Sequence, residues 1–287
     1  MKKSDLVLSL GQRLLLLLCV FLVCYVLTIV MSYVTGRLLG HNAAASVRIS
    51  AVFQDVFTFI VPAVATALFV SRRPASLLCL EKAPTAPALF LVAIILFASV
   101  PAQEAVIYWN YHLSLPASLS SFEAAARAME NTAFQTLKTL MADTSALSLI
   151  VNLLIVGVFA GFSEELLFRG CFQRLLTTGG VNRHVAVWTV AVCFSALHFQ
   201  FFGFVPRVLL GAYFGYLLLW SGSIWLPVTA HVLNNIMFVL TAWHQARVTG
   251  LETIDNEPSL WSWPATAISL ALTATAIYAL WRKRMSA

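Results

Sequence analysis

The stretch Gly161-Phe-Ser-Glu-Glu-Leu-Leu-Phe-Arg-Gly170 places three charged side chains inside a long apolar run. The charged residues are Glu164, Glu165 and Arg169, and the apolar run begins near Ala146. A charged side chain at the centre of a membrane helix costs about 2.5–3.5 kcal/mol on insertion scales. Three such residues in one helix therefore need a reason, either structural or chemical.

Helical geometry separates the roles of the three residues. Glu165 and Arg169 are four positions apart, so they lie on one face of a helix and can form an ion pair. Glu164 is turned by about 100° from Glu165 and points elsewhere. We therefore expect Glu165 and Arg169 to be a structural pair and Glu164 to be a carboxylate with a chemical role.

The composition of the whole chain indicates a membrane protein. The chain has 287 residues, of which 60% are hydrophobic and 10% are charged, and its mean hydropathy is +0.85. Soluble domains carry roughly 25% charged residues. The net charge of +6 does not indicate a nucleic-acid partner, because three basic clusters flank apolar segments. These clusters are Lys2/Lys3, Arg72/Arg73 and Arg282-Lys-Arg284.

Because about 20 apolar residues cross a bilayer, the hydropathy pattern predicts eight membrane spans. We expect them near residues 13–35, 49–70, 86–107, 146–172, 185–200, 204–220, 224–243 and 260–281. The fold class is therefore all-α: a polytopic bundle with an intramembrane polar cavity, forming a single membrane domain over residues 1–287. Eight spans put the three basic clusters on one side, which the positive-inside rule makes the cytoplasm. We expect cytoplasmic N- and C-termini and a bacterial inner membrane.

Two polar features lie outside the spans or near their ends. Residues 117–142 show apolar positions at helical spacing and predict an amphipathic helix on the outer face. Asp55 falls early in the second span and Glu104 late in the third, so we expect both at the outer interface. Glu104 has a second reading, in which it lines the cavity.

Two further polar intrusions occur in apolar helices, Phe194-Ser-Ala-Leu-His198 and His231-Val-Leu-Asn-Asn235. His231 and Asn235 are four positions apart and share a helix face. A single intramembrane histidine is more often a satisfied hydrogen bond between helices than a functional group. Three successive motifs that place Glu, His, His and Asn within the membrane favour a functional site.

Two kinds of chemistry suit these side chains. In the first, Glu164 takes a proton from water and a His or Asn donates hydrogen bonds to an oxyanion. In the second, Glu164, His198 and His231 bind Zn²⁺ and leave one position open for water. The familiar HExxH spacing of zinc proteases is absent.

The three motifs, Glu164-Glu165-x-x-x-Arg169, Phe194-x-x-x-His198 and His231-x-x-x-Asn235, resemble those of the CAAX-protease and bacteriocin-processing (CPBP or Abi) family. The similarity covers about residues 145–245. It implies an eight-helix intramembrane protease in which Glu164 activates water and His198, His231 and Asn235 complete the catalytic site. Glu165 and Arg169 are then the structural pair. The name metalloprotease is used for such enzymes, but a Glu-activated water is the reading we favour.

The resemblance implies an endopeptidase that hydrolyses a peptide bond of a membrane-associated or lipidated peptide or protein. Its partners are then the lipid bilayer and this substrate. Two other functions are open: a non-catalytic membrane scaffold or bacteriocin-immunity protein of the same fold, and a proton-coupled transporter. A transporter is the weaker alternative, because the sequence shows neither paired halves nor broken helices.

Overall fold

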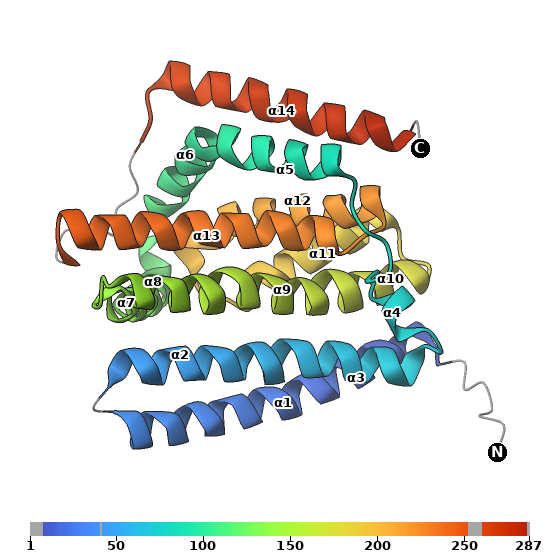
Figure 1. Cartoon of the computed structure of the whole chain (residues 1–287), viewed down its shortest axis with the longest axis horizontal. Coiled ribbons are helices and arrows are strands. Elements are labelled where there is room, and N and C mark those ends of the chain that lie inside the picture. The colour runs from blue at the N-terminus through green and yellow to red at the C-terminus, as the bar shows by residue number, and fades with distance from the viewer. Residues whose placement is uncertain (1–7, 41, 252–259, 286–287) are drawn as a thin grey trace.

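The computed structural model describes residues 8–40, 42–251 and 260–285. Every regular element in this part of the chain is helical, and the long helices run roughly parallel in one bundle (Figure 1). The expected all-α polytopic bundle is confirmed. The elements, in which η marks a π- or 3₁₀-helical stretch, are α1 (Leu10–Leu39), α2 (Ala43–Phe53), η1 (Gln54–Ile60), α3 (Val61–Val70), α4 (Pro74–Leu77), α5 (Ala86–Ala98), α6 (Val100–Tyr111), η2 (Ala117–Leu119), α7 (Ser120–Met141), α8 (Ala146–Asn152), η3 (Leu153–Phe159), α9 (Ala160–Glu165), η4 (Leu166–Gln173), α10 (Arg174–Thr178), α11 (Arg183–Ala196), η5 (Phe201–Gly203), α12 (Phe204–Ser221), α13 (Trp225–Val248) and α14 (Trp263–Met285).

The eight expected spans all coincide with helices, but they differ in length. Six helical segments of the described residues are long and apolar enough to cross a membrane by themselves. The expected third span is the pair α5 and α6, which bend by 49° at their junction. The expected fifth span is α11, which has only 14 residues. The protein is therefore an integral, multi-pass membrane protein.

The short α11 determines the depth of His198. A helix of 14 residues rises about 21 Å, which is less than the roughly 30 Å thickness of the hydrocarbon core. The chain leaves the helix after Ala196, and Phe199 adopts a left-handed backbone conformation with φ of 54°. His198 therefore lies in a turn within the bundle instead of at the end of a full-length span.

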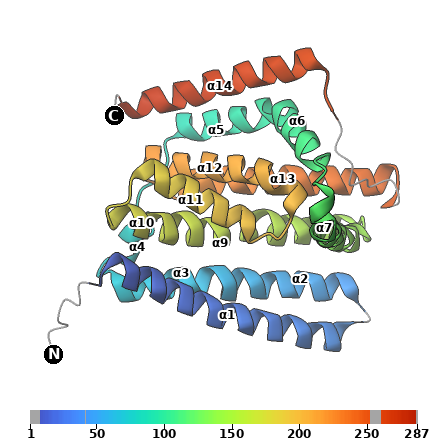
Figure 2. The ribbon, with the colours of Figure 1, turned by 180° about the vertical axis from the view of Figure 1, so that it is seen from behind.

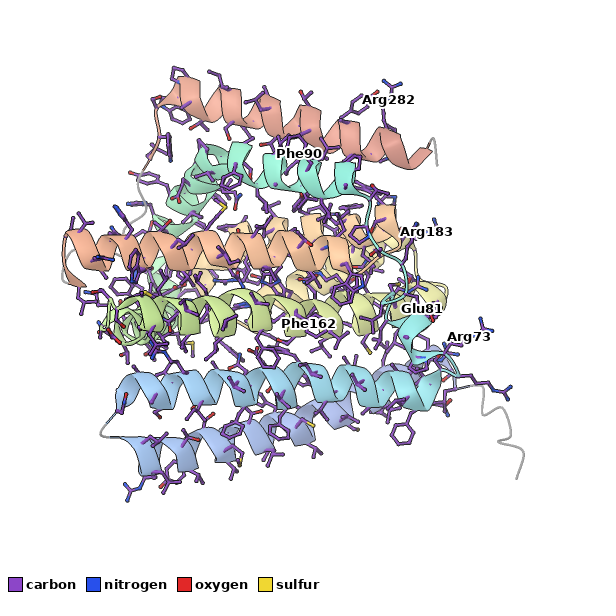
Figure 3. All side chains as sticks on the ribbon, viewed as in Figure 1. Arg73, Glu81, Phe90, Phe162, Arg183 and Arg282 are labelled. Carbon is purple, nitrogen blue, oxygen red and sulfur yellow. The ribbon has the colours of Figure 1, made fainter. Side chains whose placement is uncertain are left out.

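The order of the helices across the bundle places the fourth span in the middle. α1 packs on α2 and α3 at one side, α5 packs on α14 at the other, and α9 and α13 lie between them (Figure 2). The amphipathic segment expected at 117–142 corresponds to α7, which lies crosswise at one end of the bundle (Figure 1). Three of the basic residues, Arg73, Arg183 and Arg282, lie together at the opposite end (Figure 3). Lys2 and Lys3 lie outside the described residues, as do the side chains of Lys283 and Arg284.

Close backbone contact brings the fourth span against α13. A Cβ atom added at Gly161 would lie 3.1 Å from the backbone nitrogen of Val232 and 3.2 Å from its Cα. Gly157, one turn earlier in the fourth span, faces Ile236, one turn later in α13: a Cβ at Gly157 would lie 3.1 Å from the Ile236 side chain. Small residues allow membrane helices to approach this closely. These contacts bring the helix of Glu164 against the helix of His231.

Candidate functional site

The pair of Glu165 and Arg169 is completely buried. Nη1 of Arg169 donates to Oε1 of Glu165 at 2.7 Å, and both side chains have 0% exposure. Such a pair persists only when further hydrogen bonds replace lost hydration. Nη2 of Arg169 donates to the carbonyl oxygen of Gly211 at 2.8 Å, and Nδ1 of His231 lies 2.8 Å from the same Glu165 oxygen.

Aromatic rings surround the guanidinium of Arg169. Its Cζ lies 4.7 Å from the ring centre of Phe194 and 5.4 Å from that of Phe214. Cation–π contacts of this kind are strongest where water is excluded. A Cβ at Gly211 would lie 3.2 Å from Nη2 of Arg169 and 3.2 Å from the Phe194 ring. The apolar motif residue Phe194 and the glycine of α12 thus shape the pocket that holds Arg169.

Glu164 faces the two histidines. Its Oε2 atom lies 3.8 Å from Nε2 of His231 and 4.0 Å from Nε2 of His198. These distances exceed a direct hydrogen bond, and Oε2 is buried without a hydrogen-bond partner among the described residues. The side chain of His198 is 31% exposed and that of Glu164 is 12% exposed, so the group can be reached from outside the protein.

Hydrogen bonds at the other ring nitrogen orient both imidazoles. Nδ1 of His198 lies 2.8 Å from the carbonyl oxygen of Phe194, and Nδ1 of His231 faces the Glu165 carboxylate. Both partners accept hydrogen bonds, so each Nδ1 carries the proton and each Nε2 points toward Glu164. The His231 ring also stacks on Phe214, at 4.9 Å between centroids.

Asn235, expected to complete the catalytic group, bonds elsewhere. Its Nδ2 donates to the carbonyl oxygen of Val156 at 3.1 Å. Val156 lies in η3, on the same span as Glu164. The bond therefore connects α13 to the backbone of the fourth span, two turns before Glu164. The structure thus brings Glu164, His198 and His231 together, whereas Asn235 lies one turn beyond His231 on α13 and bonds the Val156 carbonyl.

Asp55 is a neighbour of the site that sequence reasoning misplaced. It was expected at the outer interface, but it is 3% exposed and lies in the middle of the segment Ala43–Val70, within η1. The expectation was wrong because a bundle can enclose a charged residue that hydropathy alone places at its edge. Oδ1 of Asp55 accepts a hydrogen bond from Oγ of Ser163, at 2.9 Å, beside Glu164. The signal available in the sequence was an acidic residue inside an apolar run.

The expected zinc ligands, Glu164, His198 and His231, have the donor chemistry of a zinc site. Among the described residues, no group of three His, Cys, Asp or Glu side chains is arranged to hold a metal ion. The metalloprotease expectation is therefore not supported by this geometry.

Comparison with known proteins gives a family match within the part of the chain that holds the site. Residues 146–237 match the family model described as type II CAAX prenyl endopeptidase Rce1-like. The uncharacterized protein YpbD of Bacillus subtilis (strain 168) is 28% identical over 93 residues, which cover 31% of this chain and 44% of YpbD. The match thus spans less than half the length of that curated relative. No solved structure matches the chain.

The matched segment contains all three sequence motifs, from Glu164 to Asn235. It also contains every contact that joins Glu164, Glu165, Arg169 and the two histidines. By this segment the chain is similar to the Rce1-like type II CAAX prenyl endopeptidases.

Proposed function

We propose that this protein is an intramembrane endopeptidase that uses Glu164 to activate water. The observation that carries the proposal is the position of Glu164 Oε2, 3.8 Å from His231 Nε2 and 4.0 Å from His198 Nε2. Three acceptor atoms face one another there, because both Nδ1 atoms hold the imidazole protons. A water molecule offers two O–H donors to such a group.

Hydrolysis then proceeds in two steps. Glu164 takes one proton from the water, and the water oxygen forms a bond to the carbonyl carbon of the scissile peptide. The C–N bond breaks as Glu164 returns the proton to the leaving amine, so the carboxylate is regenerated. General-base catalysis of this kind contributes about 10²–10⁴-fold to the rate.

His198 and His231 are suited to stabilise the oxyanion of the tetrahedral intermediate. Each Nε2 accepts a hydrogen bond while the water is intact. His231 Nε2 can donate to the oxyanion once the proton that Glu164 took from the water passes to it, across 3.8 Å, and that proton then returns through Glu164 to the leaving amine. The Glu165 carboxylate contacts Nδ1 of His231 and offsets the charge of the resulting imidazolium. Removal of one preorganised oxyanion donor costs about 10²–10³-fold in rate.

A lipid-embedded substrate fits the surroundings of the site. An apolar cavity of about 480 Å³ lies between α1, the fourth span and α11. Its lining includes Phe168, Ala196 and Leu197, and the last two directly precede His198. The proposed substrate is a membrane-associated or lipidated peptide or protein.

The test compares wild-type protein with Glu164→Gln in membranes, reading new peptide termini by mass spectrometry. Glu81→Gln is the matched control, because it makes the same chemical change at an exposed residue between α4 and α5. We expect a set of termini that disappears in Glu164→Gln and persists in Glu81→Gln. Identical sets of peptide termini in wild-type protein and both variants would overturn the proposal and would favour a non-catalytic scaffold or immunity role.

A second assay tests the catalytic detail with purified protein in lipid nanodiscs. The probe is a quenched peptide with a prenylated cysteine followed by three residues, chosen because the matched family is described as CAAX prenyl endopeptidases. We expect a chelator to leave cleavage unchanged. We expect Asn235→Ala to slow cleavage less than Glu164→Gln does, because Asn235 bonds the Val156 carbonyl. An equal loss in both variants would support the direct catalytic role expected from the sequence.

A further inference from the structure

Arg207, on the first turn of α12, is a cation that neither the fold nor the proposed chemistry accounts for. Its Nη2 donates to Oε1 of Gln200 at 2.7 Å. Its Nη1 is buried and has no hydrogen-bond partner in the described part of the chain. The residue as a whole is neither fully buried nor fully exposed. A guanidinium with one buried, unpartnered nitrogen, whose hydrogen bond goes to a neutral amide, lacks the anion that would offset its charge.

The helix register places Arg207 at the level of the two carboxylates of the site. Arg169 donates to the Gly211 carbonyl and Gln173 to the Gly215 carbonyl, and both bonds join residues 42 positions apart. The fourth span and α12 therefore run in the same direction at a constant offset. One turn earlier, the same offset sets position 207 level with Glu165. Consistently, the charge of Arg207 interacts electrostatically with Glu164 and His198.

The segment that carries Arg207 is held in a defined position. Glu130 on α7 accepts hydrogen bonds from the backbone N–H of Phe202, at 2.9 Å, and from Nε2 of Gln200, at 3.3 Å. Asn110 on α6 donates to the Phe201 carbonyl and accepts from the Val205 N–H. These bonds clamp the turn between His198 and Arg207 from two sides.

The guanidinium itself has little freedom on one side. A Cβ added at Gly203 would lie 3.1 Å from Nη2 of Arg207 and 3.4 Å from Nη1. Glu130 acts on Arg207 electrostatically, but its two oxygens already accept bonds from Phe202 and Gln200. Among the described residues, the fold thus presents a positioned cation that no carboxylate contacts by hydrogen bond or ion pair.

We propose that the reachable edge of the Arg207 guanidinium binds a carboxylate group of the substrate and so selects the bond that is cut. This inference rests on the proposed endopeptidase function. Guanidinium groups bind carboxylates through paired, charge-assisted hydrogen bonds. The carboxylate comes from either the free C-terminus of the peptide or an acidic side chain near the scissile bond. Arg207 is a specificity-determining residue in this scheme.

The test measures binding and cleavage of four versions of the prenylated probe peptide in nanodiscs. They combine a free or amidated C-terminus with Asp or Asn at the penultimate position. Wild-type protein and Arg207→Gln are compared for KM and kcat, and binding is also measured by fluorescence anisotropy in the Glu164→Gln background. Binding is thereby measured without turnover.

We expect one charge removal from the peptide to raise KM by about 30-fold or more in wild-type protein, as for other buried charge pairs. The same removal has no further effect in Arg207→Gln, because the partner is already absent. Sensitivity to amidation identifies the C-terminus as the source, and sensitivity to Asn identifies the side chain.

The result that overturns the inference is a wild-type protein that binds and cleaves all four peptides alike. The inference is also overturned if Arg207→Gln weakens the binding of all four peptides equally, because a merely structural role of Arg207 gives that result. If Arg207→Gln folds poorly, the milder variant Arg207→Lys is used, because it keeps the positive charge. We expect Arg207→Lys to retain part of the difference in KM between charged and uncharged peptides. Failure of the proposed function is distinguishable, because wild-type protein would then neither bind nor cleave any version.

Discussion

Two regions of this protein carry the same charge pair with the same spacing. On α7, Nη2 of Arg127 lies 2.8 Å from Oε1 of Glu123, and on the fourth span, Nη1 of Arg169 lies 2.7 Å from Oε1 of Glu165. Both pairs have Glu four residues before Arg. The side chains of the α7 pair are 42% and 21% exposed, whereas those of the second pair are 0% exposed.

The i, i+4 spacing predicts that the two side chains will contact each other in both regions. What the ion pair contributes depends on whether it is exposed or buried, which the spacing does not predict. An exposed pair gains little, because water and salt screen the attraction. A buried pair loses the hydration of both charges, so it persists only with additional partners. Glu165 and Arg169 have those partners in His231 and the Gly211 carbonyl. The buried pair therefore organises a site, whereas the exposed pair supports α7 and the segment that leads into it.

The largest expected effect comes from removal of one charge from each pair. Arg169→Met leaves Glu165 buried without its cation, which we expect to cost about 3–5 kcal/mol of unfolding free energy. Arg127→Met leaves its partner in contact with water and is expected not to shift the unfolding midpoint measurably. Both are read by denaturant titration in mixed micelles. Equal shifts in the two variants would contradict the comparison.

The neighbouring carboxylates Glu164 and Glu165 separate activity from stability. We expect Glu164→Gln to lower the cleavage rate by about 10²–10⁴-fold with no loss of stability, because its Oε2 has no hydrogen-bond partner to lose. Glu165→Gln is expected to lower the cleavage rate and the stability together, since Oε1 of Glu165 contacts Arg169 and His231. Cleavage rate and unfolding midpoint are measured on the same samples. If Glu164→Gln had a lowered unfolding midpoint and a normal cleavage rate, Glu164 would be the structural residue and not the catalytic one.

Gly161→Ala tests whether the helix contact itself supports the site. The added Cβ meets the Val232 backbone at 3.1–3.2 Å, and we expect overpacking to cost about 1–3 kcal/mol. Because α13 carries His231, separation of the two helices also moves its imidazole from Glu164. Gly11→Ala is the control, since a Cβ there meets nothing within 4 Å. Unchanged stability and cleavage in Gly161→Ala would show that the close approach is dispensable.

The smallest effect is the pH response of the exposed pair. The backbone N–H of Leu115, and then Arg127, hold the pKa of Glu123 below its ordinary value. The resulting stability is present above the ordinary pKa of about 4.3 and is lost as the pH falls through the lowered value. We expect the protection of the Leu115 amide against hydrogen exchange to fall in that acidic range. In Glu123→Gln the protection should not depend on pH, and a persistent dependence would assign it to another group.

Much of the fold was predictable because hydropathy and helical periodicity act over short stretches of chain. The spans, the amphipathic helix α7 and the pairing of Glu165 with Arg169 follow from such patterns. The depths of Asp55 and His198 did not follow, because they depend on which helices enclose Asp55 and on how early α11 ends. The second partner of Glu165, the Nδ1 atom of His231 66 residues away, carried no local signal.

Insertion energies and side-chain spacing are properties of each segment, so the amino-acid sequence indicates a multi-pass helical membrane protein with costly charges at Glu164, Glu165 and Arg169. How those charges are used depends on the packing of the helices. The directions of Glu164 and Glu165 depend on the π-helical stretches η3 and η4 on either side of α9, which change the rotation per residue. The position of His231 between the two carboxylates depends on the contact at Gly161, which joins helices that are distant in the chain.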